Sequence, residues 1–149
     1  MSIWVLRGAR AHDRGQVGAL LREARLGEED LETAFPGGYV VAESGGRIAG
    51  VAGVERYGPH ALLRSVAVAE PLRGSGVGEA LVRDRLAAAE AEGAEDVWLL
   101  TTTAERWFPR FGFVRVERAA IPAPLQASAE VSHACPASAA VLRRTRRPE

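Results

Sequence analysis

A glycine-rich segment, Arg73-Gly74-Ser75-Gly76-Val77-Gly78, is the part of the sequence best suited to chemistry. It stands between a β-rich run and a helical pattern, so its glycines let the backbone turn tightly and expose N–H groups at a helix N-terminus. Arg73 adds a positive charge to the same loop. Such a loop can hold a pyrophosphate, and it therefore predicts a phosphate site. The alternative interpretation is a flexible strand-to-helix turn that binds nothing.

The loop matches neither of two common nucleotide-binding patterns. A Walker loop requires Gly-Lys before Ser or Thr, and the sequence contains no lysine. A dinucleotide-binding G-x-G-x-x-G pattern starting at Gly74 would need glycine at position 79, which is Glu79. The lack of lysine also excludes Schiff-base chemistry. With a single cysteine, Cys135, and no CxxC or HExxH spacing, we expect no metal site and no intramolecular disulfide.

The chain of 149 residues has the composition of one soluble domain with one core. Nineteen basic and nineteen acidic residues balance, so no general attraction to nucleic acid or to an anionic membrane is expected. No signal peptide pattern is present, and no apolar run reaches the roughly 20 residues that span a bilayer. We expect a single cytoplasmic domain over 1–149 with a small-molecule partner, as a monomer or a homodimer. Residues 143–149 are expected to form a flexible basic tail.

The periodicity of apolar residues places the glycine loop inside a β-rich chain. It predicts strands at 3–7, 39–43, 48–55, 61–68, 96–103 and 112–116, a final edge strand at 139–144, and helices at 13–25, 28–35, 79–92 and 104–111. A βαβ crossover is predicted from the strand at 61–68, the loop, the helix at 79–92 and the strand at 96–103.

The loop and its surroundings resemble the acyl-CoA motif of the GNAT N-acetyltransferases. The likeness rests on Arg73-x-x-Gly76-x-Gly78, which Val66-Ala67-Val68 and Glu70-Pro71 precede. The likeness extends to about residue 118, because the order and the spacings of the family also fit the runs 39–43, 50–53 and 111–113. It implies an α/β fold of the α+β kind: a mixed, mostly antiparallel sheet flanked by helices, with a central βαβ unit that binds acyl-CoA.

The resemblance also implies where acetyl-CoA, the co-substrate, would lie. It would occupy a wedge between the strand that ends at Val68 and the strand that ends near Thr101. The implied cofactor-binding residues are Val66, Ala67, Val68, Arg73, Gly74, Ser75, Gly76, Val77, Gly78, Thr101 and Phe108. Thr101 and Phe108 stand where the family usually has asparagine and tyrosine, and phenylalanine cannot protonate the leaving thiolate. A thiol with a pKa of about 8.5 leaves as thiolate near neutral pH, so transfer without that acid is feasible.

Three residues are candidates for acceptor chemistry. N-acetylation needs a neutral amine, and Glu55, at the end of its strand, is the candidate catalytic base, acting directly or through water. The alternative interpretation of Glu55 is an exposed glutamate at the end of a strand, with no catalytic role. Arg64 and Ser65 stand where many family members carry acidic residues, and we expect both to bind substrate. The arginine suits a carboxylate, phosphinate or arsonate group, or it pairs with a local acid on the sheet.

A narrower likeness concerns the segments 61–68, 99–104 and 135–139, which resemble the arsenic-resistance branch of the GNAT proteins. Relatives in that branch acetylate arsinothricin, a glutamate mimic that carries arsenic. The resemblance implies direct transfer of an acetyl group to an arsinothricin- or phosphinothricin-like amine, with Arg64 facing its anionic group. The rival hypothesis is a non-catalytic acyl-CoA-binding sensor or interaction module, which the missing tyrosine favours.

Overall fold

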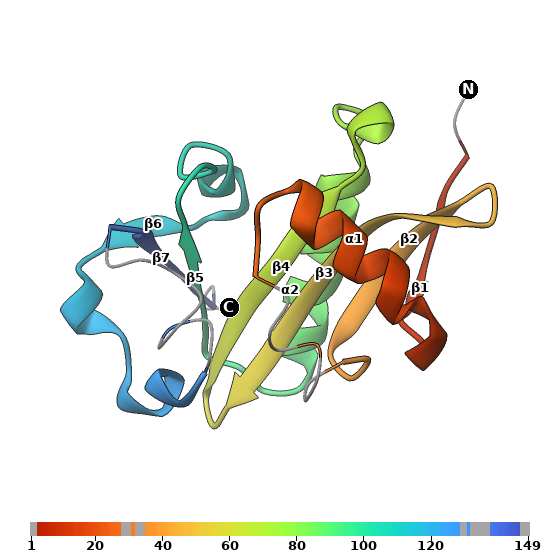
Figure 1. Ribbon diagram of the computed structural model, residues 1–149. Helices are drawn as coiled ribbons and strands as arrows, with labels where there is room; N and C mark the ends of the chain where they lie inside the picture. Colours follow the sequence, from red (N-terminus) through yellow and green to blue (C-terminus); the bar gives the residue numbers. More distant parts are fainter. Residues whose placement is uncertain (1–2, 28–30, 32–34, 129–130, 132–137, 147–149) are drawn as a thin grey trace.

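The protein is described by a computed structural model that covers residues 3–27, 31, 35–128, 131 and 138–146. Its described strands form one sheet in the order β1-β2-β3-β4-β5-β7-β6 (Figure 1). The strands are β1 (Val5–Gly8), β2 (Tyr39–Ser44), β3 (Arg47–Tyr57), β4 (His60–Val68), β5 (Asp96–Thr101), β6 (Val114–Val116) and β7 (Ala140–Thr145). Neighbouring strands pair antiparallel except β4 and β5, which are parallel. The predicted mixed, mostly antiparallel sheet is confirmed.

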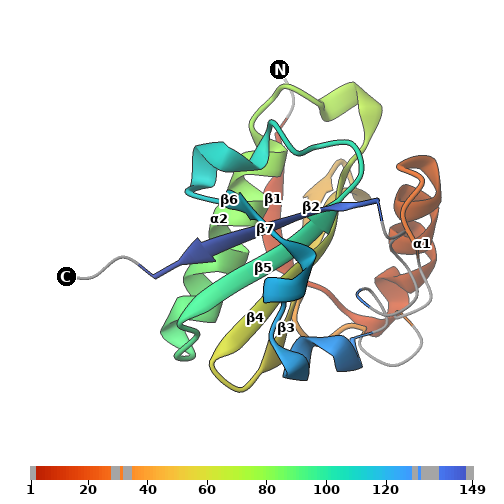
Figure 2. The ribbon, with the colours of Figure 1, turned by 90° about the vertical axis from the view of Figure 1, so that its left-hand side faces the viewer.

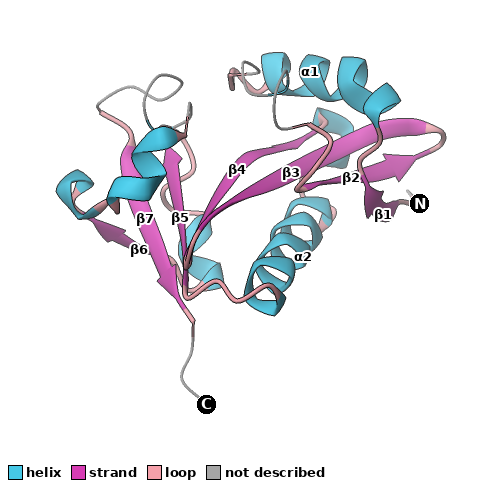
Figure 3. Ribbon diagram, turned by 90° about the horizontal axis from the view of Figure 1, so that it is seen from below, coloured by secondary structure: helices cyan, strands magenta, loops and turns pink. Residues whose placement is uncertain are grey.

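Two helices, α1 (Arg14–Glu23) and α2 (Val77–Ala91), cover opposite faces of the sheet (Figure 3). Successive residues of β2 point to opposite faces, as in any strand, so Val41 packs in the cluster under α1 and Val40 in the cluster under α2. Among the described helices, none has the length and the apolar run needed to cross a membrane.

The start of α2 packs closely on β3 because Gly50 has no side chain. A Cβ atom at Gly50 would lie 2.9 Å from Leu81 Cδ1 and 3.0 Å from Val77 Cγ1, closer than such atoms normally approach. Both Val77 and Leu81 are fully buried. This close contact holds the N-terminus of α2 against the sheet, next to the glycine-rich loop.

The sheet opens into a wedge between β4 and β5. These strands pair only from His60 opposite Asp96 to Leu62 opposite Trp98, and beyond that point they diverge (Figure 3). Meanwhile β5 stays paired with β7 over its whole length, and β4 stays paired with β3 up to Val68. Each half of the sheet therefore remains intact, and the gap between the halves confirms the predicted wedge.

A β-bulge interrupts β4 on the side of the wedge. Val51 is opposite Ala67 but Gly53 is opposite Arg64, so β4 has one residue more than β3 over this stretch. At the bulge Ser65 has a φ of 58°, in the left-handed region. That conformation costs an L-residue roughly 1–2 kcal/mol. A bulge of this kind redirects side chains and leaves backbone groups outside the ladder.

The C-terminal part of the chain differs from the sequence prediction. The strand predicted at an edge is β7, which lies between β5 and β6, so β6 forms that edge (Figure 2). The flexible tail predicted from position 143 is wrong for residues 143–145, which belong to β7. Arg144 Nε donates to the carbonyl oxygen of Phe111 at 2.7 Å, which ties this strand end to the core.

The other predicted elements agree with the structure, with one exception. The predicted helix at 104–111 is a turn followed by a 3₁₀ helix at Phe108–Phe111, because Pro109 lacks the N–H that a longer helix needs. The predicted helix at 28–35 and Cys135 lie largely or wholly outside the described residues. The remaining elements begin and end within two residues of their predicted bounds.

A buried ion pair joins β1 to the start of α1. Asp13 accepts hydrogen bonds from Arg7 Nη1 at 2.8 Å, from Arg7 Nη2 at 3.0 Å and from the backbone N–H of Arg10 at 2.8 Å. The Asp13 side chain is 2% exposed. These bonds, led by the one from Arg7, lower the pKa of the Asp13 carboxyl to about 2. The ionised form is therefore favoured by folding.

Replacing Asp13 by asparagine is expected to lower the free energy of unfolding by about 2 kcal/mol at neutral pH. Because the folded pKa lies below the unfolded value of about 3.9, this contribution is complete above about pH 4 and is lost as the pH falls through about 2. Urea unfolding of the parent protein and of Asp13→Asn, at several pH values across this range, measures the difference. A difference that stays constant with pH would contradict the assignment.

Candidate functional site

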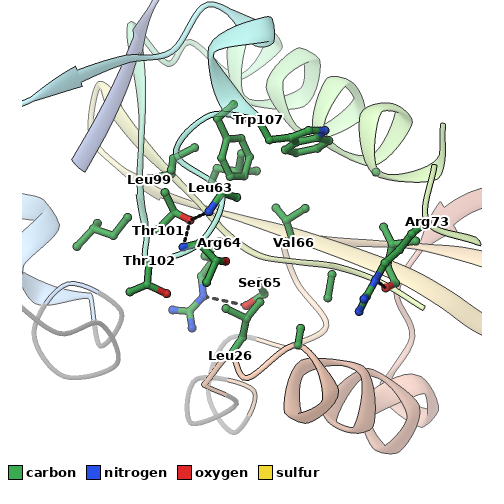
Figure 4. Close-up of a pocket in the computed structure, with 18 of the residues that line it drawn as sticks. Leu26, Leu63, Arg64, Ser65, Val66, Arg73, Leu99, Thr101, Thr102 and Trp107 are labelled. Carbon is green, nitrogen blue, oxygen red and sulfur yellow. Dashed lines mark hydrogen bonds between the residues drawn. The ribbon is translucent and has the colours of Figure 1, made fainter. Parts of the chain in front are cut away.

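A pocket of about 650 Å³ occupies the wedge between β4 and β5 (Figure 4). One wall is β4, from Leu63 to Val68, and the opposite wall is the end of β5 with the turn that follows it. The glycine-rich loop and the start of α2 close one side, and residues 24–27, which follow α1, close another. The pocket thus forms where the two halves of the sheet separate.

The glycine-rich loop has the conformation that its glycines predict. Gly74 and Gly76 have φ values of 83° and 92°, in the left-handed region that glycine adopts at little cost. Gly76 is the N-cap of α2, so the positive end of the helix dipole meets the pocket wall. Arg73 Nε donates to the carbonyl oxygen of Val68 at 3.0 Å, which holds this side chain against the end of β4.

The loop residues fall into two groups. Arg73, Gly74, Gly76 and Gly78 line the pocket, whereas Ser75 and Val77 are not among its described lining residues. The Ser75 hydroxyl donates to the carbonyl oxygen of Leu72, and Val77, the first residue of α2, is fully buried. Direct contact with a ligand is therefore expected from the first group, and the second group supports the shape of the loop.

Trp107 and Arg110, which no sequence pattern marked as site residues, both line the pocket. The indole ring of Trp107 lies close to the start of α2, since a Cβ atom at Gly78 would be 3.4 Å from Trp107 Cζ2. The Arg110 guanidinium lies over this indole, 5.3 Å from the ring centroid. Aromatic residues crowd this turn, so no pattern in the sequence separates Trp107 from its buried neighbour Phe111.

Thr101 and Phe108 lie on the β5 wall, as expected. Thr101 Oγ1 accepts a hydrogen bond from the N–H of Ala104 at 2.9 Å, so this hydroxyl stabilises the turn after β5. The Phe108 ring packs edge-on against Trp107, with centroids 4.9 Å apart, and against Phe113 at 5.9 Å. Val66, Ala67 and Val68 line the same pocket from the β4 wall.

Arg64 and Ser65 also line the pocket, on the β4 wall (Figure 4). The Arg64 side chain is only 2% exposed. Its Nε donates to Ser65 Oγ at 3.3 Å, and its Nη1 donates to Glu55 Oε1 at 3.2 Å. The interpretation that Arg64 pairs with a local acid is therefore confirmed, and its binding of a substrate anion stays a prediction for a residue that lines the pocket.

Glu55, the candidate base, is not among the described residues that line the pocket. Its Oε1 accepts hydrogen bonds from Arg64 and, at 3.0 Å, from Ser128 Oγ, and its Oε2 accepts one from the Tyr57 hydroxyl at 3.1 Å. With 19% of its side chain exposed, it is not an exposed strand-end glutamate either.

A family model described as "Acetyltransferase (GNAT) domain" matches residues 36–115. This segment contains β2 to β5, the glycine-rich loop and α2, which together form most of the pocket wall. The match extends over more than half of the chain, so the protein belongs to the GNAT acetyltransferase family. No curated protein matches the chain.

Solved structures share this fold. N-acetylglutamate synthase from Neisseria gonorrhoeae, complexed with coenzyme A and N-acetyl-glutamate, is 20% identical with a TM-score of 0.82, and the match covers 99% of this chain and 36% of the synthase chain. This chain thus spans about a third of the synthase. Rv2747 from Mycobacterium tuberculosis, in complex with CoA, is 21% identical with a TM-score of 0.80, over 96% of this chain and 99% of that one.

A third structure, a GNAT family acetyltransferase from Brucella melitensis in complex with acetyl-CoA, is 22% identical with a TM-score of 0.61. The match covers 75% of this chain and 83% of that chain. At these identities the likeness establishes the fold, while the substrate depends on the side chains of each site.

Proposed function

We propose that the protein is an acetyl-CoA-dependent N-acetyltransferase that transfers the acetyl group directly to a small amine. The observation that carries this proposal is a pocket that runs from the wedge between β4 and β5 to the glycine-rich loop at the N-terminus of α2. A narrow wedge suits an extended thioester arm, and the loop suits a pyrophosphate. The CoA and acetyl-CoA complexes of the three similar structures support the same co-substrate.

Different parts of the pocket would bind different parts of acetyl-CoA. The backbone of residues 66–68 would bind the pantetheine and the acetyl end, and the lining residues of the loop would bind the pyrophosphate. Thr101 and Phe108 would enclose the arm from the β5 wall. Catalysis then depends on proximity and on backbone N–H groups near the bulge that polarise the thioester carbonyl. The amine attacks the carbonyl carbon, the C–S bond breaks, and the thiolate leaves.

Arg64 and Ser65 would select the amine. A buried guanidinium on the pocket wall suits a second, anionic group such as a carboxylate, phosphinate or arsonate. An arsinothricin- or phosphinothricin-like glutamate analogue has this chemistry, and its acetylation would confer arsenic or antibiotic resistance in the cytoplasm. The N-acetyl-glutamate in the Neisseria gonorrhoeae synthase structure supports an acidic amino acid as acceptor, since that ligand is an acetylated one.

The described pocket wall offers few groups that could remove a proton from the amine. Among the described lining residues the one carboxylate is Glu79, which begins α2 and pairs with Arg83 at 3.0 Å. Glu55, the candidate base, would have to act through water, because its carboxylate lies off the wall and already accepts three hydrogen bonds.

Release of free CoA from acetyl-CoA, detected as thiol, tests the proposed function. The acceptors are glutamate, phosphinothricin and arsinothricin, with polyamines as controls. We expect turnover of the acidic amines and little with the polyamines. Binding of acetyl-CoA by calorimetry without turnover of any amine would instead identify the non-catalytic acyl-CoA sensor.

A further inference from the structure

A chain of hydrogen bonds connects the C-terminal part of the protein to the β4 wall of the pocket. It runs from Ser128 Oγ to Glu55 Oε1 at 3.0 Å and from Arg64 Nη1 to the same oxygen at 3.2 Å, with the Tyr57 hydroxyl on Glu55 Oε2 at 3.1 Å. We call these four residues the Glu55 relay. It joins β3, β4 and the segment after the 3₁₀ helix at Ala123–Ala127.

The burial of Arg64 explains the physical role of the Glu55 relay. The Arg64 guanidinium is almost completely removed from solvent, and a buried cation requires a nearby counter-charge and hydrogen-bond acceptors. Glu55 supplies the charge, and donors on both of its oxygens hold its carboxylate plane in place. Glu55 and the Ser65 hydroxyl then hold Arg64 at two different nitrogens. An arginine held at two nitrogens has a defined orientation in the pocket.

Core packing fixes the Ser128 end of the relay. Ser128 lies outside residues 36–115, the segment that the family model matches. It is 1% exposed, and Leu125, three residues earlier, is fully buried in a cluster with Leu62 and Trp98. The core contact of Leu125 therefore fixes the position from which Ser128 donates to Glu55.

We infer that Glu55 is a positioning residue that acts through Arg64, and that the Glu55 relay sets the preference for an amine that carries a second, anionic group. This inference rests on the proposed function, whose acceptor class it explains. A fixed guanidinium binds an anion without first losing its own conformational freedom, so an ordered Arg64 favours acidic acceptors. This role replaces the assignment of Glu55 as the base, and the proton of the amine then passes to solvent water.

Variants that keep the charge of Glu55 but disturb its position provide the test. Glu55→Asp retracts the carboxylate by one methylene, and Ser128→Ala removes one donor, so neither changes the net charge beside Arg64. We expect the ratio of kcat/KM for glutamate-type amines to that for neutral amines to fall about tenfold in Glu55→Asp and by a smaller factor in Ser128→Ala. The fall should appear in KM, with an unchanged pH profile of kcat.

A matched control removes the same kind of contact elsewhere. Glu43 on β2 accepts a hydrogen bond from Arg7 Nε at 2.8 Å, and it is not among the described residues that line the pocket. Glu43→Asp therefore shortens a glutamate in another strand-borne ion pair. Its selectivity should equal that of the parent protein, and unfolding curves for all variants check that each one folds.

Nuclear magnetic resonance of the arginine side chains gives a readout that does not need activity. Rotation of the Arg64 guanidinium about its Nε–Cζ bond should be slow in the parent protein and faster in Glu55→Asp and Ser128→Ala. Arg64→Lys, which lacks this signal, assigns it. Unchanged rotation in both variants would overturn the positioning role.

Kinetics separate the remaining outcomes. If Glu55→Gln lowers kcat equally for acidic and neutral amines and removes the acid limb of the pH profile, Glu55 is the base and the inference is wrong. If the parent protein prefers acidic amines but Glu55→Asp and Ser128→Ala keep that preference, the relay does not set it. A parent protein that turns over amines without any preference for acidic ones contradicts the acceptor class of the proposed function itself.

Discussion

Replacing Arg64 by glutamine is expected to lower kcat/KM for an acidic amine about 100-fold, which corresponds to the loss of two charge-assisted hydrogen bonds of roughly 1.5 kcal/mol each. The guanidinium lies on the pocket wall and is buried, so water replaces its bonds to an anion poorly. Arg64→Lys keeps the charge but loses the planar fork, and its loss should be about tenfold. Steady-state CoA release with acidic and neutral amines measures both variants.

A control for Arg64→Gln is needed because the substitution leaves the partly buried Glu55 without its cation. Removing one partner of a buried ion pair destabilises a protein by several kcal/mol, about 3–5 in measured cases. The double variant Arg64→Gln with Glu55→Gln removes both charges and should recover stability without recovering the turnover of acidic amines. If either variant retained the full preference for acidic amines, Arg64 would not be the anion receptor.

Replacing Gly76 by alanine is expected to weaken acetyl-CoA binding about tenfold, since an L-residue in the left-handed region costs roughly 1–2 kcal/mol. Gly76 has a φ of 92° and is the N-cap of α2 on the pocket wall. Relaxation of this strain would turn the loop and move its N–H groups away from the pyrophosphate. Calorimetry with acetyl-CoA measures the change in Kd.

Gly93 offers a matched control for this substitution. It follows the C-terminal end of α2 with a φ of 98°, and it is not among the described residues that line the pocket. A Cβ atom would meet nothing within 4 Å at either glycine, so the two alanine variants differ in place and not in crowding. Gly93→Ala should lose similar stability in urea unfolding and bind acetyl-CoA as the parent protein does. If Kd changed equally in both variants, the weaker binding of acetyl-CoA would be an effect of helix stability and not of the loop.

The elements that build the wedge were predictable because their signals are local. The spacing of apolar residues, the turn residues and the glycine-rich loop placed β4, α2 and β5 within two residues of their observed bounds. The position of β7 was not predictable in this way. The sequence predicted an edge strand followed by a tail, yet Arg143 lies over the Trp98 ring, 5.7 Å from its centroid, and Arg144 pairs with Glu90. These contacts with distant elements accompany the inner position of β7, and no local pattern in the sequence reveals them.

The sequence by itself determined the phosphate-type loop, the presence of an arginine in a strand of the wedge, and the lack of a tyrosine at position 108. Only the tertiary structure decided which of these side chains meet. The bulge at Ser65 changes which residues of β4 lie opposite β3, and one extra residue in a strand changes which face the following side chains reach. Ser128 reaches Glu55 across 73 positions of sequence, and that contact depends on core packing and not on any local pattern.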